Sequence, residues 1–350
     1  MPGPPPEIQH KVDRFIDECR SVVKRWPALV VILMHEFSRN LYPSDPYIPF
    51  RTDKHRLDAV SELLDALSTI IRDWSVVGSY DVVGRAGSGE STDDIRDKTG
   101  VVYGKLWNQY PDTIVDEARD MLVQRLTNND IPLSLVKGAT VLDAGCGSGR
   151  YSCALAMLGA RKVIGLDCGD SGLAKARALA EAKGLDSVEF CKVDVLHMPF
   201  EDESFDFVFS NGVAHHTGDI AGATREIFRV MAVGGHGWYY IYGDGGVFWY
   251  AWREMNAFMK KAIPQDYALA VLRLVGMPGN RHIFADNWYV PIEEHTSKTA
   301  CEELLKRTGF REFRRCYKGR PTDLDYFAVC GSEKDRLMWG DGELRYLISK

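Results

Sequence analysis

Residues 143–149 read Asp-Ala-Gly-Cys-Gly-Ser-Gly and come directly after the apolar segment 140–142. Alternating glycines after a strand form a tight turn whose backbone N–H groups can bind a nucleotide-like ligand. A dinucleotide site requires G-x-G-x-x-G, but Arg150 occupies the position of the third glycine. The G-K-[ST] sequence of a phosphate-binding P-loop is also absent. The pattern is therefore Asp-x-Gly-x-Gly-x-Gly, which indicates a ligand of another kind.

The chain from about residue 140 alternates short apolar segments with amphipathic ones. Strands are expected at 140–145, 162–167, 188–194, 205–211 and 237–242, and helices at 150–159, 171–184 and 220–230. A further helix is expected at 297–309, followed by a closing antiparallel pair at 312–317 and 325–331. The strands are too apolar for a sheet with one wet face, so the sequence predicts an α/β fold with a doubly wound parallel sheet. Ligands bind such sheets beyond the carboxyl ends of the strands.

The glycine pattern resembles motif I of the class I S-adenosylmethionine-dependent methyltransferases that act on small molecules. The resemblance covers residues 138–242 and extends more weakly to 331. It implies a Rossmann-like seven-stranded sheet, S-adenosyl-L-methionine as the cofactor and S-adenosyl-L-homocysteine as the product. It also implies methyl transfer to a small-molecule acceptor by in-line displacement, in which the enzyme mainly supplies orientation and a dry pocket.

The resemblance assigns cofactor-binding roles residue by residue. Asp167 would accept hydrogen bonds from the ribose hydroxyls, Asp194 and the Val195 N–H would meet the adenine, and Cys168 would lie against its face. Asn211 would sit near the methionine end. The first loop would contribute Asp143, Gly145, Cys146, Gly147 and Gly149. Structural caps are the alternative roles for Asp143 and Asp194, and packing is the alternative for Cys146 and Cys168.

His215 and His216 follow the fourth expected strand, at the mouth of this site. One of them could be a general base for an oxygen or nitrogen acceptor, or a hydrogen-bonding partner of the acceptor. The alternative is that they only shape the loop. A metal site is not expected, because adjacent histidines in an extended turn point apart and no further ligand spacing supports one.

Aromatic residues on either side of the core are candidates for substrate binding. Tyr103 and Trp107, four residues apart, would share a helical face and could close over the cationic sulfonium. Trp249 lies in an aromatic segment placed where related methyltransferases build their acceptor pockets. Packing in a hydrophobic core is the alternative for all three.

The chain divides in sequence into a helical N-terminal region at 1–100, a methyltransferase core at 101–335 with an insert at 243–298, and a tail at 336–350. Apolar residues from Leu57 to Trp74 repeat at alternating spacings of three and four, which predicts a buried helix-pairing seam. The N-terminal region is expected to serve as a lid, as a homodimer contact or as both.

Composition restricts the partners. The 350 residues carry a formal net charge of −6, which argues against nucleic acid, and the longest apolar run, 28–34, is too short to span a membrane. Eight cysteines without a C-x-x-C pair are typical of a cytoplasmic protein with free thiols.

Two other functions stay open: a non-catalytic cofactor-binding regulator or scaffold, and another transferase that uses S-adenosylmethionine or its decarboxylated form. Arsenite methylation is disfavoured because the turn Ser-Asn-Gly-Val-Ala-His-His lacks cysteine, and a protein or RNA acceptor because no basic tract or Asn-Pro-Pro-Tyr motif is present.

Overall fold

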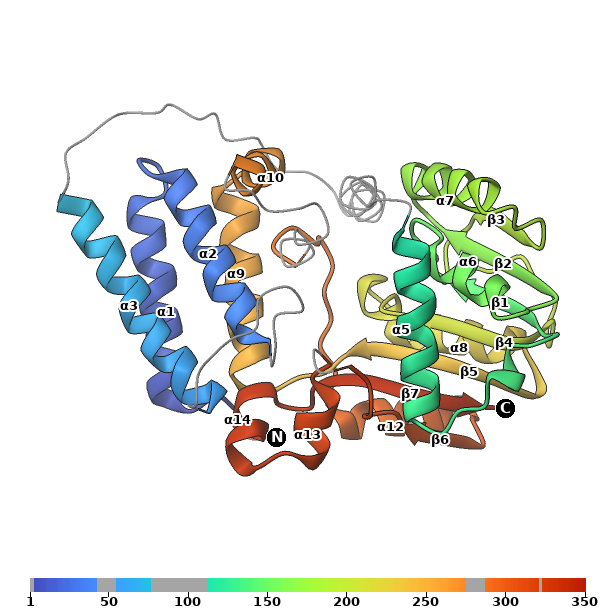
Figure 1. Ribbon diagram of the computed structural model, residues 1–350. Coiled ribbons are helices and arrows are strands. Elements are labelled where there is room, and N and C mark those ends of the chain that lie inside the picture. Colours follow the sequence, from blue (N-terminus) through green and yellow to red (C-terminus); the bar gives the residue numbers. More distant parts are fainter. Residues whose placement is uncertain (1–2, 43–54, 77–112, 275–286, 321–322) are drawn as a thin grey trace. The chain divides into compact units, whose positions relative to one another are not determined.

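The computed structural model describes residues 3–42, 55–76, 113–274, 287–320 and 323–350, and the side chains of the second range as far as Asp73. The chain forms two compact units (Figure 1). The sheet unit comprises Ser91–Gly243, Pro291–Tyr326 and Gly342–Lys350. The helical unit comprises Met1–Glu90, Asp244–Val290 and Phe327–Asp341. Each unit is therefore assembled from three separate stretches of sequence.

The sheet unit is built on a seven-stranded sheet in the order β3-β2-β1-β4-β5-β7-β6. Neighbouring strands from β3 to β5 pair in parallel, and β7 pairs antiparallel with both β5 and β6. This topology confirms the predicted Rossmann-like fold. The strands are β1 (Thr140–Ala144), β2 (Lys162–Asp167), β3 (Val188–Lys192), β4 (Phe205–Asn211), β5 (Met231–Tyr242), β6 (Glu312–Arg315) and β7 (Glu343–Ser349).

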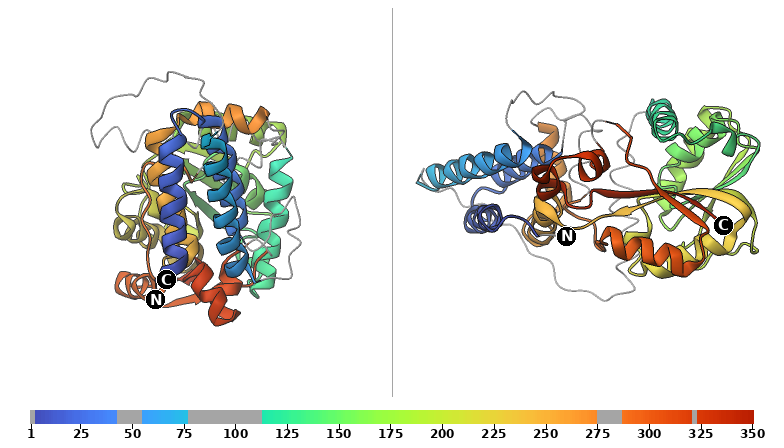
Figure 2. Two further views of the ribbon diagram at one scale, coloured as in Figure 1. Left: turned by 90° about the vertical axis from the view of Figure 1, so that its left-hand side faces the viewer. Right: turned by 90° about the horizontal axis from the view of Figure 1, so that it is seen from below.

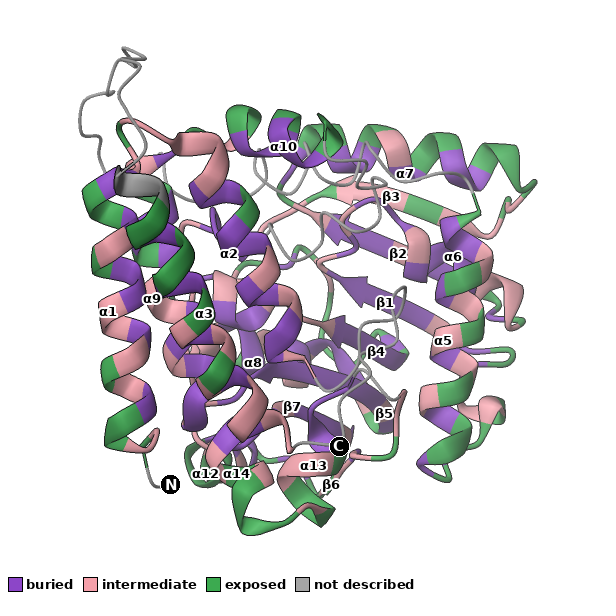
Figure 3. Cartoon of the chain, turned by 60° about the vertical axis from the view of Figure 1, so that its left-hand side comes forward, coloured by how far each residue is buried: buried purple, intermediate pink, exposed green. Residues whose placement is uncertain are grey.

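Helices cover both faces of the sheet, which explains why its central strands β1, β2 and β4 are mostly apolar (Figure 2). One face is covered by α5 (Ile114–Asn128), α6 (Arg150–Met157) and α7 (Asp170–Ala182). The opposite face is covered by α8 (Ile220–Val230) and α12 (Lys298–Thr308), which contact each other. Figure 3 shows the central strands largely buried between these layers, while the helices expose their outer sides. The central strand positions are therefore core, and polar side chains gather beyond the strand ends.

The C-terminal part of the sheet unit differs from the sequence prediction. Residues 325–331 are not a strand, because Asp325–Cys330 form the helix α13. The antiparallel partner of β6 is β7, which lies in the region predicted to be a tail. Leu344, Tyr346 and Ile348 of β7 are buried, so the alternation typical of a strand is present in that sequence. The aromatic and β-branched residues of 325–331 suggested a strand, but tertiary packing overrides this weak preference.

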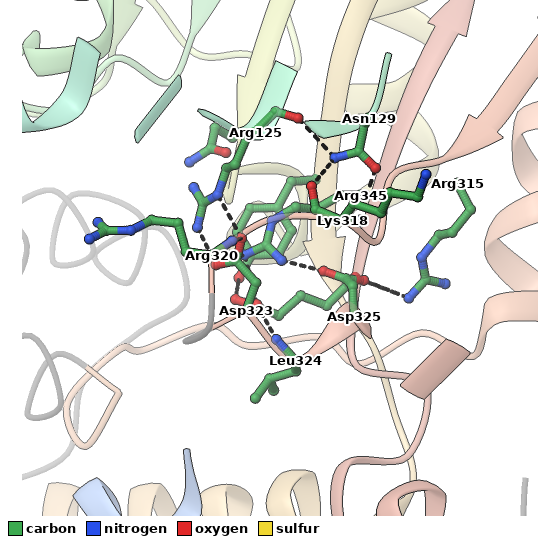
Figure 4. Close-up of polar contacts among 12 residues, drawn as sticks. Arg125, Asn129, Arg315, Lys318, Arg320, Asp323, Leu324, Asp325 and Arg345 are labelled. Atoms are coloured by element: carbon green, nitrogen blue, oxygen red, sulfur yellow. Dashed lines mark hydrogen bonds and ion pairs between the residues drawn. The ribbon is translucent and has the colours of Figure 1, made fainter. Parts of the chain in front are cut away.

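Arg345 of β7 lies at the centre of a buried ion-pair network (Figure 4). Its guanidinium pairs with the Asp325 carboxylate and, at 2.7 Å, with Oε2 of Glu343. Asp325 also pairs with Arg315 of β6 at 2.7 Å, and Asp323 pairs with Arg125 of α5 at 2.6 Å. Burial of charge is tolerated only when it is paired in this way. The network therefore ties β6, β7 and α5 to the segment around residues 323–325.

The helical unit consists of α1 (Pro6–Val22), α2 (Pro27–Leu41), α3 (Arg56–Val76), α9 (Gly246–Ala262), α10 (Gln265–Leu274) and α14 (Glu333–Trp339). Helix α1 packs on α3 and α9, and α14 packs on α9 and α3. The predicted seam is confirmed over its described part, because its side chains from Leu57 to Ile71 are at most 5% exposed. The predicted insert at 243–298 contributes α9 and α10 to this unit, and α14 joins it from the region predicted to be core and tail.

Candidate functional site

The glycine loop Gly145–Gly149 connects the end of β1 to α6. Gly145, Gly147 and Gly149 have φ angles of 85°, 55° and 77°, a region that favours glycine. A Cβ on Gly145 would lie 2.3 Å from the Val213 side chain, and one on Gly149 would lie 2.6 Å from Cβ of Ala176. Glycine is thus required here both for backbone conformation and for close packing. We call this loop and the adjoining N-terminus of α6 the cradle, a combination that suits a nucleoside-type ligand.

Asp167 ends β2 and holds the glycine loop. Its Oδ2 accepts the N–H of Gly147 at 2.9 Å, and its Oδ1 accepts the N–H of Gly169 at 2.8 Å. Burial raises the pKa of this carboxyl, while the backbone hydrogen bonds oppose the rise. Each carboxylate oxygen can accept more than one hydrogen bond, so Asp167 has capacity for a ribose diol as well. Cys168, the next residue, is exposed beside it.

Asp143 lies beneath the loop and is 2% exposed. Its Oδ2 accepts a hydrogen bond from Oγ of Ser152 in α6 at 2.6 Å. Burial raises the pKa of Asp143 to about 7, and the nearby Asp167 carboxylate adds to the rise. The contact ties β1 to α6, which favours the structural role among the two considered for this residue. Cys146 is also buried, and burial raises the pKa of its thiol well above the usual value.

The remaining cofactor candidates follow β3 and β4. Oδ1 of Asp194 accepts the N–H of Leu196 at 2.9 Å, while Val195 between them is buried. Oδ1 of Asn211 accepts the indole N–H of Trp238 at 3.0 Å. Because β1 to β4 run parallel, their carboxyl ends meet at one edge of the sheet. The structure thus brings these residues to the same edge as the glycine loop.

His215 and His216 form a short 3-10 turn, Ala214–His216, directly after β4. Nδ1 of His215 accepts the N–H of Tyr242 at 3.3 Å, so its proton is assigned to Nε2. Nδ1 of His216 lies 2.8 Å from the carbonyl oxygen of Ile292 and must donate to it, so Nε2 is the unprotonated nitrogen. The partners therefore assign opposite roles to the two rings: His215 presents a donor and His216 an acceptor.

Both histidines are neutral near pH 7. Burial lowers the pKa of His215 well below its usual value. Burial lowers the pKa of His216 to about 4, although the Ile292 carbonyl and the Glu293 carboxylate oppose this. The His215 ring stacks on Tyr242 with 3.7 Å between ring centroids. This packing explains why neither ring can be solvated and charged without cost.

Sequence reasoning missed the segment that covers this turn. Glu293 and His295 pair through Oε1 and Nε2 at 2.5 Å, and each side chain is 6% exposed. Nδ1 of His295 lies 3.0 Å from the carbonyl oxygen of Gly243, at the end of β5. The sequence Glu-Glu-His directly before the capped helix at 298 was the available signal, but nothing in it specifies contact with the turn at 214–216.

The substrate-binding candidates are placed differently. Tyr103 and Trp107 lie outside the described residues. Trp249 belongs to α9 in the helical unit, is 1% exposed, and packs against Phe248 and Trp252 with ring-centroid distances of 4.8 and 5.6 Å. This placement favours the packing role for Trp249. Over the ranges that the structure describes, no three His, Cys, Asp or Glu side chains are grouped to hold a metal ion.

Comparison with known proteins identifies the class of domain that this sheet and site define. Residues 135–238 match the family model described as "Methyltransferase domain". The matched range runs from just before β1 into β5 and includes the glycine loop, Asp167, Asp194 and both histidines of the turn. The chain therefore carries a methyltransferase domain of the S-adenosylmethionine-dependent class, a family that implies S-adenosylmethionine as the cofactor.

Curated relatives share this domain over a short length. The chain is 37% identical to a sterol 24-C-methyltransferase of Pneumocystis carinii over 100 residues, which are 28% of this chain and 26% of the relative. It is 34% identical to that of Schizosaccharomyces pombe over 104 residues, which are 29% of this chain and 28% of the relative. A tRNA U34 carboxymethyltransferase of Idiomarina loihiensis is 26% identical over 212 residues, covering 59% of this chain and 54% of the relative. The chain thus spans about a quarter of the length of the sterol methyltransferases it matches.

Among solved structures, an S-adenosylmethionine-dependent methyltransferase from Mesorhizobium loti is 20% identical with a TM-score of 0.42, covering 67% of this chain and all of that one. Separately, within the described ranges no helix has the length and apolar character needed to cross a membrane.

Proposed function

We propose that the protein transfers the methyl group of S-adenosylmethionine to a small-molecule acceptor and releases S-adenosylhomocysteine. The observation that carries the proposal is the contact between Asp167 and the glycine loop, within a domain that matches the methyltransferase family. A glycine loop at a helix N-terminus, with a carboxylate at the end of the next strand, is the combination that suits a nucleoside with a ribose diol. When bound, the cofactor would supply an electrophilic methyl group.

In this proposal the chain's own residues bind and orient the cofactor. The loop backbone at Gly145, Cys146, Gly147 and Gly149 would lie against the cofactor, with its N–H groups held by Leu166, Asp167 and Cys146. Asp167 would also accept hydrogen bonds from the ribose. Asp194, Val195 and Cys168 would surround the adenine. Asn211 would lie toward the methionine end, because it ends β4 next to the histidine turn. Asp143 would act indirectly, by holding the loop to α6 through Ser152.

His215 and His216 would face the acceptor, with His215 donating a hydrogen bond through Nε2 and His216 accepting one. The sterol methyltransferases that match this domain make apolar small molecules reasonable first acceptors to test. The acidic net charge of the chain is consistent with such acceptors rather than with nucleic acid. Tyr103 and Trp107 remain candidates for contacts with the methyl group.

The test is to incubate the purified full chain with S-adenosylmethionine carrying a labelled methyl group and a metabolite extract that includes a lipid fraction. Mass spectrometry should then find a labelled small molecule formed in step with S-adenosylhomocysteine. A Gly147→Val variant, in which the cradle is filled, is the control and should form neither. Cofactor binding by calorimetry without any product would instead identify a cofactor-binding regulator or scaffold.

A further inference from the structure

The segment 292–296 is joined to the histidine turn and to the end of β5 by a series of hydrogen bonds. The Glu294 N–H donates to the carbonyl oxygen of His215 at 2.9 Å, and the Thr296 N–H donates to that of Tyr242 at 3.4 Å. The side chains of His216 and His295 bind backbone carbonyls from the two sides, as described above. This segment lies outside residues 135–238, which match the methyltransferase family.

The two ring nitrogens of His295 both face acceptors. Nδ1 faces the carbonyl oxygen of Gly243, which can only accept, and Nε2 faces Oε1 of Glu293. Nδ1 must therefore carry a proton, and a second proton lies between Nε2 and Oε1. This shared proton links two side chains that are each 6% exposed.

Two polar atoms in this cluster lack a partner among the residues that the structure describes. They are Oε2 of Glu293 and Nε2 of His215, and both are buried. The tautomer of His215 makes its Nε2 a donor, and Oε2 of Glu293 is an acceptor. Buried polar groups are nearly always satisfied, so an unmatched donor and acceptor in one cluster indicate a polar group that binds there. A hydroxyl both donates and accepts one hydrogen bond and fits this pair of atoms.

We propose that Glu293, oriented by His295, accepts the proton of the methyl acceptor, and that the acceptor group is a hydroxyl. This inference rests on the proposed methyl transfer. The acceptor O–H bond breaks, an O–CH₃ bond forms, and the methyl carbon leaves the sulfonium sulfur, which keeps the electron pair. The proton moves to Oε2 of Glu293 and is later released to solvent. The sulfonium charge disappears as the Glu293–His295 pair gains one, so the net charge of the buried site stays constant.

The two histidines of the turn are less suited to this step. His215 already carries its proton on Nε2, so that nitrogen cannot take another. His216 can accept at Nε2, but a proton there would create a new charge on a buried ring, whereas a proton on Glu293 neutralises its carboxylate. The titratable groups that face the Glu293–His295 pair are His215 and His216 from the turn and Tyr242 from β5.

The test compares Glu293→Gln with Glu294→Gln in the labelled-methyl assay. The neighbouring Glu294 is the matched control, because its carboxyl is hydrogen-bonded by the backbone of Ile220 at the start of α8. Glu293→Gln should lower turnover by about 10²–10⁴-fold with cofactor affinity changed less than about 3-fold, and Glu294→Gln should stay within about 3-fold on both. His295→Gln should lower kcat more than it changes KM. If Glu293→Gln does not fold, Glu293→Asp, which keeps the charge but retracts it, should show an intermediate loss.

Three results overturn the inference. Turnover of Glu293→Gln within about 3-fold of the wild-type rate shows that a buried water satisfies Oε2. A product methylated on carbon, nitrogen or sulfur excludes the hydroxyl. Histidine-selective ¹⁵N NMR needs no methyl acceptor and should show one proton on Nδ1 of His295 and a second, shared proton at Nε2. Glu293→Gln should change the Nε2 signal. An unprotonated Nδ1 would contradict the proposed hydrogen bonding of His295. Absence of product from wild-type protein with every extract removes the proposed function itself, and this inference with it.

Discussion

Asp167 accepts the N–H of Gly147 at 2.9 Å and thereby joins the end of β2 to the glycine loop that follows β1. The same carboxylate thus holds the loop and is the proposed acceptor for the ribose hydroxyls of the cofactor. Asp167→Ala should weaken S-adenosylmethionine binding by about 10- to 150-fold, because a charged hydrogen bond is worth roughly 1.5–3 kcal/mol. Isothermal titration calorimetry measures this. Asp170→Ala is the control, since Asp170 is exposed and pairs with Lys192 at the surface, and this variant should bind normally.

Gly147→Val should abolish cofactor binding. The φ of Gly147 is 55°, where a β-branched residue is strained, and its side chain would enter the cradle. Gly184→Val separates the two effects, because Gly184 has a φ of 64° with open space around the position of a Cβ. Both variants should lose about 1–2 kcal/mol of stability, and only Gly147→Val should lose binding. Normal affinity in Gly147→Val would show that the ligand binds elsewhere.

Leu64→Glu should destabilise the helical unit by at least about 3 kcal/mol, because Leu64 is fully buried in the seam of α3 and the new charge would have no partner. Ala66→Glu adds the same charge on the exposed side of α3 and should be nearly neutral. Denaturant unfolding followed by circular dichroism compares the two. Equal stability of both variants would mean that the seam does not support the fold.

The free energy of unfolding should depend on pH partly through the protonation of His216. Its folded pKa of about 4 is lower than the unfolded value of about 6.5, so its contribution is complete above pH 6.5 and is lost as the pH falls toward 4. The difference is at most about 3 kcal/mol. His216→Gln should flatten the curve of unfolding free energy in this window. A curve unchanged by the substitution would contradict the burial of a neutral ring.

Arg345→Met should cost about 3–5 kcal/mol, because it leaves the buried carboxylates of Asp323 and Asp325 short of a partner. Lys334→Met removes an exposed ion pair with Asp58 and should cost less than about 1 kcal/mol. Thermal unfolding at pH 7 measures both. A small loss for Arg345→Met would mean that the methionine packs well enough to offset the unpaired charges.

Most of the sheet could be predicted from sequence because its signals are local. The apolar runs of β1, β2 and β4, the glycines at 145–149 and the cap at Ser297 each specify their own backbone. The strand β7 was missed although Leu344, Tyr346 and Ile348 alternate, because buried Arg345 and Glu343 look like surface residues until Asp323 and Asp325 are brought beside them. Such pairing depends on residues about 20 positions apart and leaves no local pattern.

The residues of the candidate site also fall into those that the sequence predicts and those that only the folded chain brings together. Residues at the ends of consecutive strands follow from the topology, so the glycine loop, Asp167, Asp194 and Asn211 could be placed together in advance. Glu293 and His295 reach the site from a segment nearly 80 residues beyond His215, and no periodicity links the two. The opposite tautomers of His215 and His216 depend on backbone partners at Tyr242 and Ile292, which only the folded chain supplies.

The position of β7 between β5 and β6 has a consequence for synthesis of the chain. About 100 residues separate the end of β5 from the start of β7, so at roughly 5–20 residues per second a ribosome takes about 5–20 s to add them. During that time β5 presents an open row of N–H and C=O groups, the template on which edge-to-edge aggregation begins. A nascent or truncated chain that stops before residue 343 would leave this edge of β5 unpaired. Such a chain would be expected to bind chaperones.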